Sequence, residues 1–323
     1  MNFWKKRKFK KTIDGYAGGT VSCKQCGKGV RLNTLQPLAI FQCPKCGAAD
    51  FAPMKISTLW LFQPLGGGGG GSVYKAYDTA TELFCAVKLA HRDRKDDPEI
   101  IDHIDKEASI LEEIGRHPNI VRFVSGGFAD GEHYCAIEFL EGERLSDRVA
   151  RLGRMLDGPV REMALDILSA EQQIYGKGYL YRDLKPQNII IRPDNVHVLF
   201  DFGSCLPLSD ARVPPPDRFV EGSAYYMPPE RLWRSGEDQP SEIYSLGMVM
   251  YHALTGRTFF NSTQTIKELA LKHVSALRLT VSADAVRSSS PAMINIINDM
   301  IKIKPEDRFQ TFGAVQRALL DKK

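Results

Sequence analysis

The first third of the chain carries apolar and polar positions in patterns typical of β-strands. Three stretches are rich in aromatic and β-branched residues or alternate apolar with polar positions, and they lie at residues 58–62, 72–77 and 83–89. Six consecutive glycines, Gly66 to Gly71, separate the first stretch from the second. The pattern predicts strands on both sides of a glycine-rich segment.

Helical spacing takes over later in the chain. Residues 99–114 carry apolar side chains three or four positions apart, which predicts an amphipathic helix. Beyond about residue 142 most periodic segments are helical, apart from short apolar stretches at 189–191 and 196–200, which we expect to be strands. Strands followed by helices predict an α+β architecture in two lobes.

Charge divides the 323 residues near position 60. The formal net charge is +4, but residues 1–60 hold 11 Lys and Arg against 2 Asp and Glu, a net charge of +9. The remainder holds 32 basic against 37 acidic residues, a net charge of −5. A content of 43% hydrophobic and 25% charged residues excludes a wholly disordered chain, and no apolar run approaches the 18 or so residues of a membrane span.

Residues 1–20 are expected to form a basic tail. Most of its charge lies in the run Lys5-Lys6-Arg7-Lys8 and in Lys10 and Lys11. A solvated run is the simplest interpretation, and contact with nucleic acid or an acidic lipid surface is the alternative. No apolar segment follows, so the pattern differs from that of a secretory signal peptide.

Four of the seven cysteines form two C-x-x-C pairs, Cys23 with Cys26 and Cys43 with Cys46. Sixteen residues separate the pairs, a spacing that fits a tetrahedral metal site. Disulfides are the rival interpretation, but an odd cysteine count without a signal peptide predicts a reducing, cytoplasmic compartment. Residues 21–52 resemble a zinc ribbon or a rubredoxin-type knuckle, with structural Zn²⁺ expected and iron as the alternative. The metal could serve only to fold a short segment, or it could signal.

The glycine run is ambiguous by itself. Gly66, Gly68 and Gly71 occupy a G-x-G-x-x-G frame with Val73 two residues beyond it. Glycine lets backbone N–H groups approach phosphate oxygens, but a glycine run also suits a flexible linker. A dinucleotide-binding fingerprint would need a helix next, and the alternating residues 72–77 argue against one.

Further short motifs follow in a fixed order. They are Ala86-Val87-Lys88, Glu107, Tyr181-Arg182-Asp183-Leu184-Lys185-Pro186-Gln187-Asn188, Asp201-Phe202-Gly203, Met227-Pro228-Pro229-Glu230 and Asp307-Arg308-Phe309. Each occurs by chance, but the ordered set is specific, and on it the sequence resembles eukaryotic-type Ser/Thr protein kinases. The resemblance covers residues 58–320 and implies a bilobal fold, with a small β-rich lobe at about 58–140 and a helical lobe at about 141–320.

The resemblance implies a role in phosphoryl transfer for the residues of these motifs. Lys88, oriented by Glu107, is expected to hold the α- and β-phosphates of ATP. Asp183 is expected to accept or orient the proton of the substrate hydroxyl, and Lys185 to neutralise charge on the transferred group. Such positioning and charge neutralisation are most of what this reaction asks of a protein.

The resemblance also implies where the nucleotide and its metal bind. Asn188 and Asp201 are the expected Mg²⁺ ligands. The expected nucleotide contacts are Leu65, Gly66, Gly68, Gly71, Val73, Ala86, Lys88, Glu138, Leu140 and Ile190.

Three positions depart from the family pattern. Tyr181 replaces the usual His, and its ring is expected to fill an apolar stack with Phe202. Gly70 stands where an aromatic residue usually caps the glycine loop, which predicts a modest loss of nucleotide affinity. Glu242 replaces an Asp that accepts backbone N–H bonds from the catalytic loop, so a looser loop is expected.

Arg182 marks kinases whose activation segment is often ordered by phosphate. Ser209 is the predicted phosphorylation site, and a segment ordered without phosphate is the alternative. Two classes of function follow. The first is a Ser/Thr protein kinase that uses ATP and Mg²⁺ on a protein substrate, and the second is a pseudokinase scaffold. The basic N-terminal part could additionally bind nucleic acid.

Overall fold

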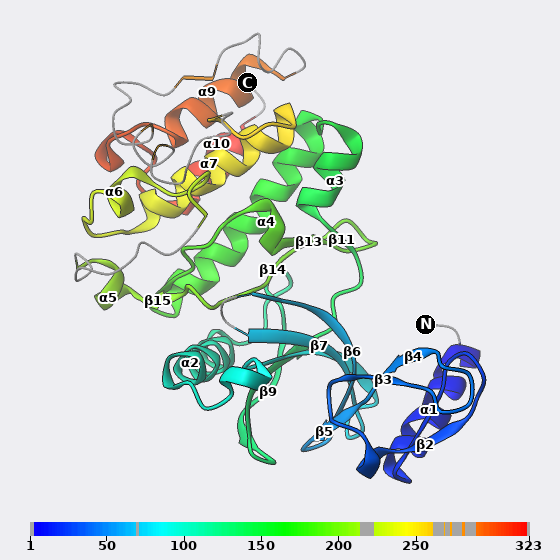
Figure 1. Cartoon of the computed structure of the whole chain (residues 1–323). Helices are drawn as coiled ribbons and strands as arrows, with labels where there is room; N and C mark the ends of the chain where they lie inside the picture. The colour runs from blue at the N-terminus through cyan, green and yellow to red at the C-terminus, as the bar shows by residue number, and fades with distance from the viewer. Residues whose placement is uncertain are drawn as a thin grey trace. The chain divides into compact units, whose positions relative to one another are not determined.

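The computed structural model describes residues 3–68, 71–213, 223–260, 268, 272, 280–281 and 289–321, with backbone alone for residues 3–8 (Figure 1). The chain forms two compact units. The first comprises Met1–Ser109 and Phe123–Phe139, and the second Ile110–Arg122 and Leu140–Lys323.

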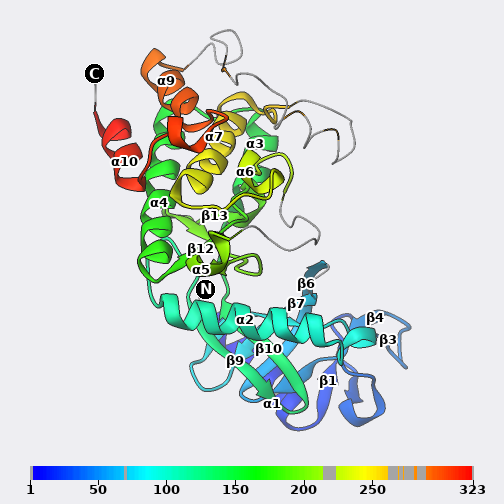
Figure 2. The ribbon, with the colours of Figure 1, turned by 90° about the vertical axis from the view of Figure 1, so that its left-hand side faces the viewer.

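A six-stranded antiparallel sheet forms the centre of the first unit. Its strand order is β5 (Met54–Ile56), β6 (Leu59–Gly68), β7 (Gly71–Asp78), β8 (Leu83–Leu89), β10 (Glu132–Glu138) and β9 (Phe123–Ala129). The turn η2 (Arg92–Arg94) precedes helix α2 (Pro98–Ile114), which runs alongside β9 and β10 (Figure 2). The approach is close, because a Cβ added at Gly126 of β9 would come within 2.7 Å of Ala108 Cβ on α2. These elements confirm the strands and the helix predicted between residues 58 and 114.

The first unit begins with a helix and two small hairpins. They are α1 (Phe3–Ala17), the pair β1 (Thr20–Ser22) and β2 (Gly29–Arg31), the turn η1 (Leu32–Thr34), and the pair β3 (Ile40–Gln42) and β4 (Ala49–Phe51). A helix therefore stands where we expected a tail. Its reason is a short apolar stripe of Phe9, Ile13 and Tyr16, spaced for one helix face, of which the last two are buried. The side chains of residues 5–8 lie outside the described part, so nucleic-acid contact stays a prediction.

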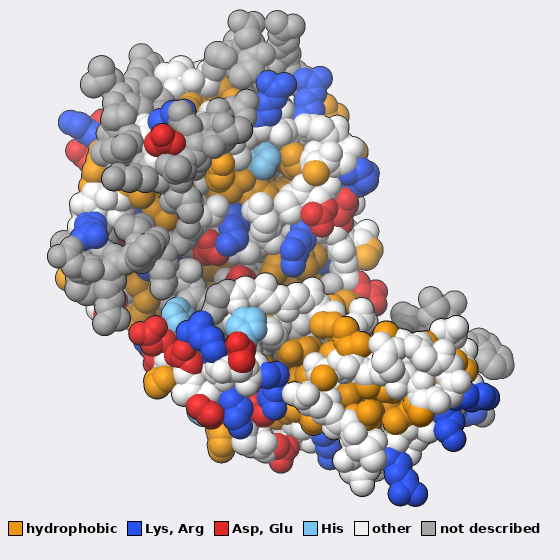
Figure 3. All heavy atoms as spheres, viewed as in Figure 1, with side chains coloured by type: hydrophobic (Ala, Val, Ile, Leu, Met, Phe, Trp, Pro, Cys, Tyr) orange, Lys and Arg blue, Asp and Glu red, His pale blue; other side chains and the backbone are white. Residues whose placement is uncertain are grey.

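The N-terminal module, residues 3–52, packs directly on the sheet. The ring of Phe9 lies 4.8 Å from that of Phe62 on β6, 5.4 Å from Tyr77 on β7 and 4.9 Å from Phe84 on β8, measured between ring centres. Apolar side chains gather over this region on the face shown in Figure 3, with Lys and Arg at its edge. The short link between the module and the first long strand predicts such packing, and the structure confirms it.

Helices dominate the second unit. They are α3 (Leu145–Leu152), α4 (Asp157–Gly176), α5 (Leu208–Ala211), α6 (Pro229–Leu232), α7 (Gln239–Thr255), α9 (Pro291–Met300) and α10 (Phe312–Leu320). Helices α4 and α7 pack together at the centre and bury Ile167, Leu168 and Leu246 (Figure 1). Among the described residues, no helix has the length and apolar character needed to cross a membrane.

Short strands and turns complete the second unit. They are β11 (Glu143–Arg144), β12 (Tyr179–Leu180), η3 (Pro186–Asn188), β13 (Ile189–Ile191), β14 (His197–Leu199), β15 (Leu206–Pro207) and η4 (Pro305–Asp307). One small sheet has the order β11-β13-β14, and a second pairs β12 with β15. The two strands predicted at 189–191 and 196–200 are confirmed as β13 and β14.

Candidate active site

Lys88 and Glu107 form an ion pair within the first unit. Lys88 lies on β8 and Glu107 on α2, and Lys88 Nζ is 2.6 Å from Glu107 Oε2. The Glu107 side chain is only 5% exposed, whereas that of Lys88 is 19% exposed. A buried carboxylate therefore fixes the ammonium group while leaving part of it accessible, and the pairing expected from the sequence is confirmed.

The sheet register places three of the expected nucleotide contacts on one face. Val73 of β7 pairs with Lys88, and Ala86 lies two residues before Lys88 on β8. Alternate residues of a strand share a face, and so do paired residues on neighbouring strands. Val73, Ala86 and Lys88 are half-buried there, while Val87 and Leu89 fill the core on the other face.

Strands β6 and β7 meet at the glycine run. Gly66 and Gly68 belong to the end of β6, and Leu65 just before them is 40% exposed. Gly71 begins β7 with a φ of +127°, and a Cβ there would lie 2.2 Å from Leu89 O. Only glycine fits so close to a neighbouring strand in this conformation. Gly70 lies outside the described residues.

His91 holds the described part of the glycine loop, and sequence reasoning missed it. Its Nε2 is 2.7 Å from Gly68 O, and its Nδ1 is 2.9 Å from Ser72 Oγ. A neutral imidazole with its proton on Nε2 satisfies both contacts, donating to the carbonyl and accepting from the hydroxyl. The side chain therefore joins the two strands of the hairpin next to the glycines.

Glu138, Leu140 and Ile190 are the remaining expected nucleotide contacts. Glu138 ends β10 in the first unit, and the next residue, Phe139, donates its backbone N–H to Phe84 O at 3.2 Å. Leu140 and Ile190 belong to the second unit, and both are half-buried. Ile190 lies at the centre of β13, so the small sheet of β11, β13 and β14 fixes its position.

Asp183, Lys185 and Asn188 form one hydrogen-bonded group in the second unit. Asp183 Oδ2 accepts from Lys185 Nζ at 2.6 Å and from Asn188 Nδ2 at 2.8 Å. Asp183 is 8% exposed, and its Oδ1 has no hydrogen-bond partner among the described residues. A carboxylate that is fixed through one oxygen and unsatisfied at the other is suited to accept a proton from a hydroxyl group outside the chain.

Asp201 follows β14 in a left-handed backbone conformation, with a φ of +66°. The next residue, Phe202, is buried, and its ring packs edge-on against Tyr181 with 5.1 Å between ring centres. Tyr181 Oη donates to Phe200 O at 2.6 Å, and burial raises the pKa of this phenol well above its usual value. The neutral Tyr181 ring thus fills the apolar stack with Phe202, as expected from the sequence.

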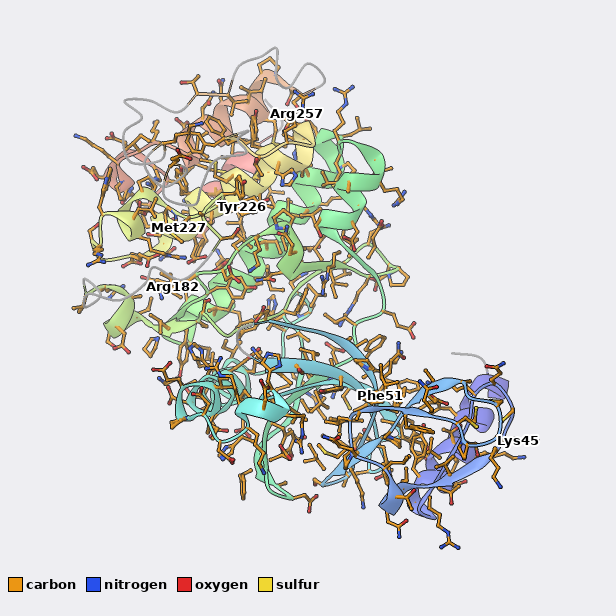
Figure 4. The ribbon with its side chains drawn as sticks, in the orientation of Figure 1. Lys45, Phe51, Arg182, Tyr226, Met227 and Arg257 are labelled. Carbon is orange, nitrogen blue, oxygen red and sulfur yellow. The ribbon has the colours of Figure 1, made fainter. Side chains whose placement is uncertain are left out.

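Arg182, which Figure 4 labels in the second unit, is paired with a buried carboxylate. Its Nε and Nη2 donate to Glu237 Oε1 at 3.0 and 2.9 Å, and Glu237 Oε2 accepts from Arg231 Nε at 2.7 Å. The backbone N–H of Arg182 donates to Glu242 Oε1 at 2.9 Å, so the longer Glu242 keeps the bond expected of an Asp. The role of Glu237 could not be predicted from local sequence, because its pairing with Arg182 joins residues 55 positions apart.

Two further residues of the motif set are joined by an ion pair. Arg308 Nη1 and Nη2 donate to Glu230 Oε1 and Oε2 at 2.7 and 2.9 Å, with both residues buried. Ser209 lies exposed on α5 and donates to Asp210 Oδ1 at 2.9 Å. Residues 214–222, which include Pro214-Pro215-Pro216, lie outside the described part.

The four cysteines predicted to bind metal meet at one point of the N-terminal module. The Sγ atoms of Cys23 and Cys46 are 3.7 Å apart, those of Cys26 and Cys43 are 3.6 Å apart, and all four lie within 4.8 Å of one another. A tetrahedron with metal–sulfur bonds of about 2.3 Å has edges of about 3.8 Å. The cysteines are free thiols, so among the described residues the disulfide interpretation is wrong and the metal geometry fits.

Two equivalent turns place these thiols. Gly27 N–H donates to Cys23 O, and Gly47 N–H donates to Cys43 O, both at 2.9 Å. Both glycines have a φ close to +70°, which explains the glycine after each pair. Asp50 joins the two turns, because its Oδ2 accepts the backbone N–H of Lys24 at 3.0 Å.

Comparisons with known proteins agree with this architecture. The protein kinase domain family matches residues 61–320. Serine/threonine-protein kinase PrkC of Bacillus subtilis is 31% identical over 78% of this chain and 38% of its own length. Serine/threonine-protein kinase Pkn1 of Myxococcus xanthus is 31% identical over 82% of this chain and 38% of its own length. A probable serine/threonine-protein kinase of Clostridium perfringens is 29% identical over 78% of this chain and 36% of its own length.

The chain thus spans less than two-fifths of the length of these three relatives, and the family match begins after the four-cysteine module. The match includes part of the first unit, most of the second unit and every motif from Lys88 to Arg308. By this match, the chain belongs to the protein kinase family.

Proposed function

We propose that this chain is an active serine/threonine protein kinase, which transfers the γ-phosphate of ATP to a hydroxyl group of a protein substrate. The observation that carries the proposal is Asp183, fixed by Lys185 and Asn188 through Oδ2 and unsatisfied at Oδ1. Held in this way, Asp183 can accept or orient the proton of a substrate hydroxyl, as the reaction requires.

In the proposed reaction the oxygen of a Ser or Thr hydroxyl forms a bond to the γ-phosphorus, and the bond from that phosphorus to the β,γ-bridging oxygen breaks. ADP leaves with the electron pair of the broken bond. Asp183 Oδ1 accepts or orients the hydroxyl proton, and Lys185 neutralises charge on the transferred group. Lys88, held by Glu107, pairs with the α- and β-phosphates.

The remaining expected site residues keep the nucleotide in place. The glycines of β6 and β7 present backbone N–H groups to the phosphates, and Val73, Ala86 and Ile190 contact the base. Leu65, Glu138 and Leu140 complete these contacts. Asn188 and Asp201 offer an amide oxygen and a carboxylate for Mg²⁺, because the amide nitrogen of Asn188 is already used by Asp183. A bound Mg²⁺ would neutralise phosphate charge.

We further propose that the four cysteines hold one structural Zn²⁺. Four thiolates at tetrahedral distances suit zinc, and a reducing compartment such as the cytoplasm would keep them reduced. We assign residues 21–52 to this metal module and residues 58–320 to the kinase domain, whose lobes divide near residue 140. Because α1 packs on the sheet, residues 3–17 hold the metal module, residues 21–52, in place against it.

Transfer of labelled γ-phosphate to a generic protein substrate tests the function. The wild-type chain is compared with Asp183→Asn and with Asp147→Asn, which changes an exposed carboxylate in the first turn of α3. We expect Asp183→Asn to lose at least a hundredfold in rate, and Asp147→Asn to retain wild-type activity. Equal background transfer by all three proteins would overturn the proposal in favour of a pseudokinase.

A further inference from the structure

Two glutamates meet in the interior of the second unit. Glu171 on α4 is 2% exposed and Glu242 on α7 is 1% exposed. Burial raises the pKa of Glu171 well above its usual value, and the interaction with Glu242 raises it further. Helices α4 and α7 pack against each other, and the two carboxyl groups are buried between them close enough to interact.

Each of these carboxyl groups has one oxygen that lacks a partner. Glu171 Oε1 and Glu242 Oε2 are buried and have no hydrogen-bond donor among the described residues. Two ionised carboxylates would have no hydrogen to share and would repel each other in a medium of low dielectric constant. A single hydrogen satisfies both oxygens, because a protonated carboxyl group donates and an ionised one accepts.

The surrounding charges indicate whether both glutamates are ionised or one of them is protonated. Arg182 Nη2 is 2.9 Å from Glu237 Oε1, and Arg231 Nη2 is 2.6 Å from Glu237 Oε2 and 4.0 Å from Glu242 Oε1. The two arginines balance the negative charges of Glu237 and Glu242. An ionised Glu171 would add a third negative charge without a cation to balance it in this cluster.

We propose that Glu171 stays protonated and donates its hydrogen to Glu242 Oε2, and so acts as a positioning residue for the catalytic loop. The other oxygen of Glu242 accepts the backbone N–H of Arg182 at 2.9 Å. Arg182 has a φ of +71°, an unfavourable conformation for this residue type, and it directly precedes Asp183. The shared hydrogen thus fixes the carboxylate that holds the backbone next to the proposed base.

The pH dependence of the cluster follows from its neighbours. Burial raises the pKa of Glu242 to about 7, with Arg231 and Arg182 opposing this and Glu237 adding to it. Tyr181 lies close enough for the charge of Glu171 to raise its pKa, and its buried phenol is neutral near pH 7. A carboxyl group with a raised pKa binds more protons in the folded than in the unfolded chain, so its contribution to stability declines as the pH rises above about 4.5.

Glu171→Gln tests the shared hydrogen, because the amide group can donate to Glu242 at every pH and does not titrate. Equilibrium urea unfolding of the full metal-loaded chain between pH 5 and 8.5 compares it with the wild type. The control is Glu162→Gln, an exposed glutamate on the same helix. We expect the ratio of the folding equilibrium constant of Glu171→Gln to that of the wild type to rise at least tenfold from pH 5 to pH 8.5. The control should follow the wild type, and parallel curves for all three would overturn the proposal.

Turnover tests the positioning role, and this arm alone rests on the proposed kinase function. At pH 7.5, Glu171→Gln should keep kcat within about threefold of wild type. Glu171→Leu removes the donor and should lower kcat about tenfold to a hundredfold, with KM for ATP within about twofold. Equal kcat for the Gln and Leu variants would refute positioning. Absence of transfer by the wild type would refute the function and leave the unfolding result standing.

Discussion

Phe9→Ala is the sharpest test of the contact between the N-terminal module and the sheet. The substitution removes three ring contacts, to Phe62, Tyr77 and Phe84. Burying a phenylalanine fully is worth about 1.5–3 kcal/mol, and an aromatic pair adds about 0.5–1.5 kcal/mol. For a half-buried ring with three partners we expect a loss of about 2–3 kcal/mol, or roughly 5–10 °C in the unfolding midpoint of this unit.

The assay is calorimetry of the zinc-loaded chain, with Phe128→Ala as the matched control. Phe128 lies on β9, is 68% exposed and loses the same atoms on substitution. We expect its midpoint to fall by less than about 2 °C, because little apolar area is uncovered. Equal shifts for the two variants would refute the reasoning, since the ring of Phe9 would then contribute no more than an exposed one.

Three further predictions concern the loop, the activation segment and the metal. His91→Phe removes the contacts to Gly68 and Ser72, so KM for ATP should rise about three- to tenfold in steady-state assays with kcat little changed, and an unchanged KM would contradict this. Ser209→Ala should transfer phosphate at the wild-type rate, because Glu237 already pairs with Arg182; a loss beyond threefold would show that a phosphate is needed. A strong chelator should release one zinc per chain, measured by a colorimetric indicator, and lower the unfolding midpoint, with recovery on adding Zn²⁺; no metal in the purified chain would refute the site.

Much of the fold and of the site follows from local sequence. The strands around the glycine run carry their own alternation, and Lys88, Glu107 and Asp183 stand in motifs of fixed order. The glycine after each cysteine pair signals the turn that it makes. A left-handed turn or a pair of metal ligands requires particular residue types at a particular spacing, and the local sequence shows both.

Other features depend on contacts between distant segments. Helix α1 was not predicted, because its three apolar residues stand in a stretch rich in lysine. They stabilise the helix only by packing against the aromatic side chains of the sheet. Glu171 lies among polar residues of α4, and nothing local shows that it is buried against Glu242. His91 and Glu237 likewise depend on distant residues, because Ser72 lies 19 positions from His91 and Arg182 lies 55 positions from Glu237. Spacing cannot predict such pairs, because tertiary packing creates them.

The central claim is that this chain transfers phosphate, and the stoichiometry of the reaction tests it most directly. ADP release and phosphoserine or phosphothreonine formation are measured together on a protein substrate, for the wild type and for Lys88→Met. The account predicts one ADP for each phosphorylated hydroxyl in the wild type, and loss of both products in the variant. ATP binding by the wild type without formation of phosphorylated protein would contradict it.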